Sequence, residues 1–213
     1  MSYDAPDPGV RQLQRLGTFT DVVYAITIWR IFDLVPRPGV AGASWPSLGA
    51  YFSSEWLALL ILLVGLLFTV VYWLQSNTLS SGLARTDAKH SVLSIVQIFS
   101  LLVFLYSLRM GIEVGDALGA RAFESLAAAN VGLWGALAWR YASKNRRLLR
   151  DDVTDLKAKQ LATRITGEPI TAAITVPVAF AGPIFWELSW FAYPVIKAIV
   201  ARRAKAMESV DGG

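Results

Sequence analysis

The sequence predicts an all-α, multi-pass membrane protein with six transmembrane helices and both termini in the cytoplasm. Two observations predict this fold class: the composition and the placement of the basic residues. Of 213 residues, 54% are hydrophobic and only 17% are charged, and the mean hydropathy is +0.46. Soluble domains carry about 25% charged residues. Because so little polar surface cannot cover a globule in water, the lipid bilayer is the expected solvent.

Six apolar stretches come close to the length of about 20 residues that a spanning helix needs. They are residues 13–35, 55–76, 91–108, 118–140, 165–182 and 183–201, the last two divided at Gly182-Pro183. The charged segment 141–164 is expected at the inner membrane surface, either as a short amphipathic helix or as a solvated connector. Residues 1–12 and 204–213 are predicted tails, and no internal repeat divides the six-span unit 13–203.

The basic residues give the orientation of these spans. All but four of the 20 Lys and Arg fall on one side of the membrane in this topology, the exceptions being Arg30, Arg37, Arg109 and Arg121. Cytoplasmic loops carry the excess of Lys and Arg. Six spans with both ends in the cytoplasm therefore follow. Since the positive charge is explained by topology, no nucleic-acid partner is expected.

Several function classes are excluded by what the sequence lacks. There is no cysteine and only one histidine, His90, so thiolate and histidine metal clusters cannot form. The nucleotide-binding, zinc-protease, serine-hydrolase and calcium-loop motifs are all absent. We therefore expect no enzyme activity, no catalytic residues, no cofactor and no bound metal.

Polar residues inside the spans have structural explanations. Gln97 and Asn130 are expected to form hydrogen bonds between helices. Glu168 follows Arg164 by four residues, a spacing that favours an ion pair on one helix. Glu187, near the outer interface, is expected to reach the interface or to find a partner.

Asp21 places a carboxylate inside the first span, where an unpaired charge costs about 2.5–3.5 kcal/mol on insertion scales. Helical geometry, at 100° per residue, divides the polar and apolar residues of this span into two sets. One set contains Phe19, Ile26, Arg30 and Asp33. The other contains Thr18, Asp21, Ala25 and Phe32. One set is expected to face helices of the same subunit, and the other a partner or a pore.

The first span contains Arg15, then three residues, then Phe19-Thr20-Asp21, and Ala25-Ile26 follow. This pattern resembles the signature of the transmembrane protein 175 potassium channels in their bacterial six-span form. A weaker likeness is found at residues 72–77, because that family ends its second span with a Trp followed by polar residues. The resemblance implies a homotetramer in the cell membrane, the inner membrane of a bacterium. The first spans would surround a central pore that is closed by a hydrophobic constriction and is permeable to K⁺.

The resemblance also assigns roles to individual residues. It places Ile26 at the constriction, within a pore lining of Phe19, Val22, Ile26, Arg30 and Asp33. It places Arg15, Phe19, Thr20, Asp21, Trp73 and Asn77 in a structural signature that ties span one to the spans that follow. Expected donors to Asp21 are Trp73, Asn77 and Ser94.

Arg30 departs from that family, which has an apolar residue one turn beyond the constriction. Four arginines around an axis would repel cations in a narrow pore. Asp33 lies close enough to neutralise Arg30 as an ion-pair partner, and Glu113 or Glu187 could add negative charge from the outer side. Alternatively, the Arg30 side chain could reach the outer membrane interface. The sequence therefore predicts a potassium-selective or cation-leak channel. The alternatives are a non-conducting, channel-like membrane protein whose pore Arg30 blocks or repurposes, and a proton or anion path along Arg30 and Asp33.

Overall fold

The computed structural model describes residues 7–38, 44–114 and 117–211, so parts of both predicted tails lie outside the described residues. These ranges are helical apart from turns, connecting segments and one isolated bridge between Leu83 and Leu149. The α-helices are α1 (Pro8–Asp33), α2 (Leu48–Ser81), α3 (Ala88–Val114), α4 (Leu118–Ser143), α5 (Asp155–Arg164), α6 (Gly167–Val178), α7 (Pro183–Ser189) and α8 (Tyr193–Asp211). Short 3-10 turns cover η2 (Lys144–Arg146), η3 (Ala179–Ala181) and η4 (Trp190–Ala192).

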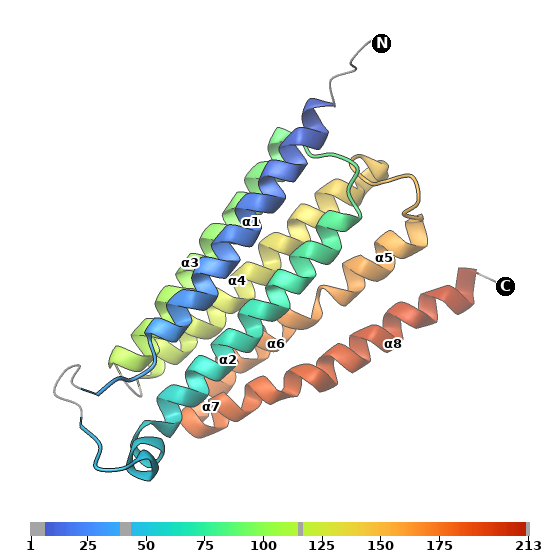
Figure 1. Ribbon diagram of the computed structural model, residues 1–213. Coiled ribbons are helices and arrows are strands. Elements are labelled where there is room, and N and C mark those ends of the chain that lie inside the picture. The colour runs from blue at the N-terminus through green and yellow to red at the C-terminus, as the bar shows by residue number, and fades with distance from the viewer. Residues whose placement is uncertain (1–6, 39–43, 115–116, 212–213) are drawn as a thin grey trace.

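The helices form an elongated bundle (Figure 1). The most extensive contact joins α3 to α4, and α4 also packs on α6. Helix α1 lies along the outside of the bundle, where it contacts α2 and α3. Helix α8 diverges from the other helices and contacts α5 and α6. The start of α1 and the end of α8 both point toward the same end of the bundle in Figure 1.

Within the described residues, three helices are long and apolar enough to cross a membrane: Leu48–Ser81, Ala88–Val114 and Pro183–Met207. In the last of these, α7, η4 and α8 follow one another as a continuous helix. Helices α1 and α4 are less apolar overall than α2 and α3, and α6 is only 12 residues long. The chain turns at Gly182, whose φ of 113° favours glycine. This is also the residue at which the sequence divides the last two apolar stretches.

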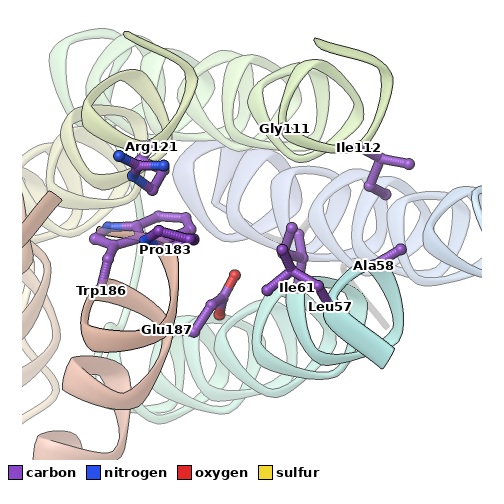
Figure 2. Close-up of a pocket in the computed structure, with 9 residues that line it drawn as sticks. All are labelled: Leu57, Ala58, Ile61, Gly111, Ile112, Arg121, Pro183, Trp186 and Glu187. Atoms are coloured by element: carbon purple, nitrogen blue, oxygen red, sulfur yellow. The ribbon is translucent and has the colours of Figure 1, made fainter. Parts of the chain in front are cut away.

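Small residues on α4 allow its neighbours to approach closely. A Cβ atom added at Gly132 would lie 2.7 Å from Pro169 Cδ on α6, and one at Gly135 would lie 2.7 Å from Gln97 Nε2 on α3. Buried polar side chains add hydrogen bonds between helices. The Tyr72 hydroxyl donates to the Ala128 carbonyl at 2.7 Å, and Asn130 Nδ2 donates to Ser100 Oγ at 2.8 Å. A cavity remains between α2, α3, α4 and α7 (Figure 2).

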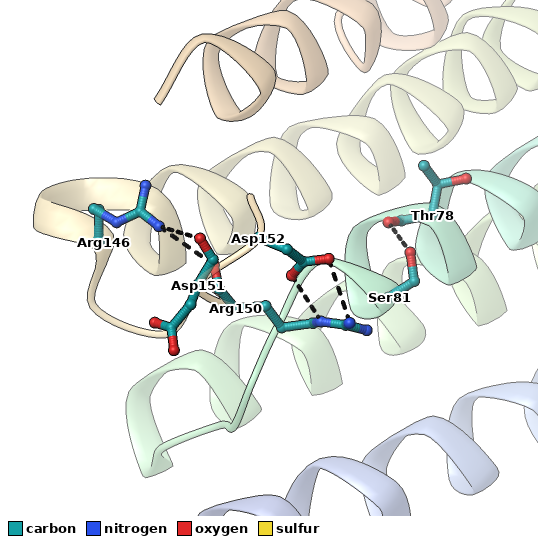
Figure 3. Close-up of polar contacts among 6 residues, drawn as sticks. All are labelled: Thr78, Ser81, Arg146, Arg150, Asp151 and Asp152. Carbon is teal, nitrogen blue, oxygen red and sulfur yellow. Dashed lines mark hydrogen bonds and ion pairs between the residues drawn. The ribbon is translucent and has the colours of Figure 1, made fainter. Parts of the chain in front are cut away.

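The segment that follows α4 is anchored to the bundle. Leu148, Leu149 and Val153 are buried in a cluster with Trp139. The guanidinium group of Arg146 donates to two backbone carbonyls of the same segment, and Arg150 pairs with Asp152 at 3.0 Å (Figure 3). Helix α5 then begins after Thr154, whose hydroxyl accepts from the Lys157 N–H.

The loop between α2 and α3 is fixed by Asp87. One of its oxygens accepts from the His90 N–H at 2.8 Å and the other from the Tyr141 hydroxyl at 2.8 Å. Partial burial raises the pKa of this carboxyl, but these two hydrogen bonds and the nearby charges of His90 and Arg147 outweigh burial. The net result is a pKa below the usual Asp value.

The expected ion pair between Arg164 and Glu168 is wrong. Helix α5 ends at Arg164 and α6 begins at Gly167, so the two side chains do not lie on one continuous helix. Glu168 instead accepts a hydrogen bond from the Tyr193 hydroxyl at 2.6 Å and lies 3.9 Å from Lys197 Nζ, both on α8.

Candidate functional site

Helix α1 carries every pore-lining residue that the sequence predicts. The Asp7 carboxylate caps its first turn by accepting from the Gly9 N–H at 2.8 Å, and Pro8 occupies the first helical position. From there α1 continues for 26 residues without a break, so it presents its side chains as straight stripes along its length.

One stripe of α1 packs against the rest of the chain. Its members, spaced three or four residues apart, are Thr20, Tyr24, Thr27 and Ile31, and all four are buried. This stripe belongs to neither of the two sets of residues predicted from the sequence, although its members have the regular spacing of one helix face. The set of residues around Asp21 was a candidate for this role, but Thr18, Ala25 and Phe32 are exposed.

The opposite stripe is exposed along the whole helix. It contains Phe19, Val22, Ile26, Trp29 and Arg30. Ile26, at its centre, is 54% exposed although it is a large apolar side chain. A continuous apolar stripe of this size, left uncovered by its own chain, marks a surface that contacts a partner, lipid or a pore.

Asp21 lies beside this stripe and contacts α2. The indole Nε1–H of Trp73 donates to Asp21 Oδ1 at 2.9 Å. The other two expected donors are placed differently: Asn77 is exposed, and the Ser94 hydroxyl donates to the His90 carbonyl. Arg15 is exposed, and the buried Thr20 hydroxyl donates within its own helix to the Leu16 carbonyl at 2.8 Å.

Arg30 is part of a charged cluster at the end of α1. Its guanidinium group lies 3.3 Å from Asp33 Oδ2, while Arg37 approaches the other oxygen of the same carboxylate at 2.9 Å. Asp33 is therefore shared between two arginines. Glu113, one of the other expected partners, pairs with Arg109 on α3 at 2.6 Å. These residues line a cavity of about 590 Å³ between the ends of α1 and α3.

Glu187, the remaining expected partner of Arg30, is buried elsewhere. It is 1% exposed and lies on α7, at the cavity between α2, α3 and α4. The sequence predicts that Glu187 either reaches the interface or finds a partner, but the side chain is buried within the subunit and its carboxyl oxygens have no hydrogen-bond partner among the described residues. Among the described residues, no three His, Cys, Asp or Glu side chains come together in a way that could hold a metal ion.

The exposed stripe of α1 can line a pore if several copies of the chain surround a common axis. Ile26 would then form an apolar ring, and Arg30, four residues further along, would form a charged ring about 6 Å away. A narrow apolar ring excludes hydrated ions by dewetting. The shared carboxylate of Asp33 would offset part of the charge at the second ring.

Comparisons with known proteins are informative about the fold. No protein-family model matches the chain, and no curated protein sequence does. Among solved structures, the chain is similar to the crystal structure of a lysosomal potassium-selective channel TMEM175 homolog from Chamaesiphon Minutus, with a TM-score of 0.71 and 16% identity. The likeness covers 91% of this chain and 98% of that one. The resemblance predicted from two short motifs is thus confirmed for the fold, over nearly the whole chain.

Proposed function

We propose that this chain is a member of the TMEM175 family that assembles as a homotetramer in the membrane and conducts cations through a central pore. The observation that carries the proposal is the exposed apolar stripe of α1 around Ile26, on a chain with the fold of a potassium-selective channel homologue. In this proposal K⁺ is the permeant ion, and the lipid bilayer and further copies of the chain are the partners.

The rotation of α1 about its own axis supports a pore-lining role for Ile26. The buried stripe holds one side of the helix against α2 and α3, and Trp73 holds Asp21. Ile26 lies five residues after Asp21, or about 140° around the helix. The contacts that fix α1 to its own subunit therefore turn Ile26 away from that subunit.

A cytoplasmic location for both termini is part of the proposal. The loop before α3 contacts the start of α1, where the Thr86 N–H donates to the Gly9 carbonyl. It also contacts the basic segment after α4, where the Ala84 N–H donates to the Leu148 carbonyl. Most of the basic residues therefore belong to one end of the bundle, the arrangement expected of a cytoplasmic end. We propose the cell membrane, the inner membrane of a bacterium, as the location.

A second candidate function rests on Arg30. The Arg30 side chain is 59% exposed, and its carboxylate partner is shared with Arg37, so two positive charges face one negative charge. If four such clusters surround the axis, they oppose cation entry. In that case the protein keeps the channel fold without conducting cations.

Planar-bilayer recording of purified protein tests the leading proposal. We expect currents whose reversal potential follows the K⁺ gradient, and a larger current when Ile26→Ala widens the apolar ring. Ile28→Ala serves as a matched control, because Ile28 lies on the same helix but on a different face. The absence of K⁺ current from both the wild type and Ile26→Ala would overturn the channel proposal.

A further inference from the structure

The cavity drawn in Figure 2 lies inside the subunit, and no residue that lines it belongs to α1. Its volume is about 150 Å³. The lining residues come from four helices: Leu57, Ala58, Ile61, Gly111, Ile112, Arg121, Pro183, Trp186 and Glu187. Ile61, Arg121, Trp186 and Glu187 form a buried floor, whereas the other five residues are partly exposed and form a rim. A small molecule can therefore reach the floor from the rim.

A carboxyl group without a partner points into this cavity. Glu187 is 1% exposed, yet neither of its carboxyl oxygens has a hydrogen-bond partner among the described residues. Figure 2 shows this group directed into the space between the Pro183 and Trp186 side and the Leu57 and Ile61 side. Burial of an ionised carboxylate is unfavourable unless a cation or several hydrogen bonds compensate it.

A second buried carboxyl group lies close by. Glu124 on α4 is also 1% exposed, and its Oε2 lacks a hydrogen-bond partner in the described part of the chain. A Cβ atom added at Gly111, on the cavity wall, would lie 3.5 Å from this oxygen. Glu124 and Glu187 interact electrostatically. The basic group on the floor, Arg121, is directed to the Ala179 carbonyl, to which Nε and Nη2 donate at 3.2 and 3.0 Å.

We propose that this cavity binds a small organic cation, an ammonium or guanidinium group on a short apolar body, with the Glu187 carboxylate as its counter-ion. A charged head provides the N–H donors that both oxygens of Glu187 lack. Leu57, Ile61 and Ile112 provide apolar contact for the body. The cavity volume corresponds to about five water molecules, which limits the ligand to a short chain.

Other occupants fit the chemistry of the cavity less well. A calcium ion takes six to eight oxygen ligands and magnesium a near-octahedral set, whereas the lining provides one carboxylate. A proton on Glu187 would remove its charge but would leave an O–H donor and a carbonyl acceptor without partners. An organic cation would neutralise the charge of Glu187, donate hydrogen bonds to its oxygens and contact the apolar walls.

Equilibrium dialysis of the purified protein with radiolabelled ethylammonium tests the proposal directly. We expect saturable binding to the wild type, at least about tenfold weaker binding to Glu187→Gln, and weaker binding to Glu124→Gln. The matched control is Glu113→Gln, which removes an exposed carboxylate paired with Arg109 and should leave binding unchanged. Tetraethylammonium, which is too large for the cavity, should not compete.

A second variant keeps the test decisive if Glu187→Gln does not fold. Ala58→Phe fills the cavity from its rim while both carboxyl groups remain, and it should abolish ethylammonium binding. The proposal would be overturned by non-saturable binding of ethylammonium to the wild type. It would also be overturned if Ala58→Phe or folded Glu187→Gln bound ethylammonium as tightly as the wild type, and water would then be the occupant. Because binding is measured without any current, this result is independent of whether the protein conducts.

Discussion

The indole nitrogen of Trp73 donates a 2.9 Å hydrogen bond to the Asp21 carboxylate and so joins the first two helices of the bundle. The bond has a geometric consequence, because it resists rotation of α1 about its own axis. With Tyr24 and Ile31 buried on one side of α1 and Asp21 held at its flank, Ile26 is directed away from its own subunit.

Removal of this bond should loosen α1. We expect Trp73→Phe to lower the free energy of unfolding by about 1 kcal/mol, the typical net value of one hydrogen bond, because Asp21 loses its donor. Thermal unfolding in detergent measures the change. Trp56→Phe, which alters an exposed tryptophan on the same helix, is the control, and an equal loss in both variants would contradict a specific role for Trp73.

Arg30 should limit cation flow if α1 lines the pore. Arg30→Leu removes one positive charge per subunit and leaves Asp33 paired with Arg37. We expect cation conductance in bilayers to rise about threefold or more, with a smaller effect at high salt because ions screen the charge. The control is Arg109→Leu, which removes a charge from the same cavity but from α3.

The outcome of that substitution separates the two candidate functions. A current that is present in the wild type and larger in Arg30→Leu supports the conducting form. A current that is present only in Arg30→Leu supports a non-conducting protein that Arg30 blocks. Unchanged conductance in Arg30→Leu would show that Arg30 lies away from the ion path.

Close packing between α4 and α6 gives a stability prediction. Gly132→Ala places a Cβ atom 2.7 Å from the Pro169 ring, and overpacking of this kind costs about 1–3 kcal/mol. Gly119→Ala, on the same helix with no atom within 4 Å of the added Cβ, should instead be neutral or slightly stabilising. Thermal unfolding compares the two, and equal melting temperatures would contradict the packing.

Asp87 should make stability depend on pH at the acidic end. Because folding lowers its pKa, the folded state is stabilised at every pH above the usual Asp value of about 3.9. This contribution is lost as the pH falls from that value through the lower pKa of the folded state. Asp87→Asn should therefore lower the melting temperature at pH 6 and differ less from the wild type at pH 3.

An exposed carboxylate provides the control for this measurement. Asp152→Asn removes a carboxylate that pairs only at the surface with Arg150, so it should change the melting temperature little at either pH. If the difference in melting temperature between Asp87→Asn and the wild type stays constant from pH 6 to pH 3, the charge of Asp87 does not contribute to stability.

Local spacing predicted some of these contacts and missed others. The ion pair of Arg30 with Asp33 followed from residues three apart on one helix, and that helix is continuous. The pairing of Arg164 with Glu168 failed for the opposite reason, because the helix ends between them. Spacing predicts a contact only where both residues share one helix.

Burial depends on contacts between distant parts of the chain, which spacing does not reveal. Because Glu187 follows Trp186 near the end of a span, the sequence predicts that it reaches the interface or finds a partner. In the structure α7 packs against α2, and Glu187 is buried with it. The packing stripe of α1 was also missed, since Tyr24 and Thr27 are polar enough to resemble exposed residues and are buried only because α2 and α3 cover them.

In the proposed channel, the Ile26 stripe of α1 lines a pore formed by several copies of the chain. The protein has no cysteine of its own, so Ile26→Cys introduces a single thiol per subunit. We expect Cd²⁺ to block the K⁺ current of Ile26→Cys in bilayers, because thiolates facing one axis bind a soft metal ion together. The buried position Ile31→Cys should be insensitive. A K⁺ current through Ile26→Cys that Cd²⁺ leaves unchanged would show that Ile26 does not line the pore.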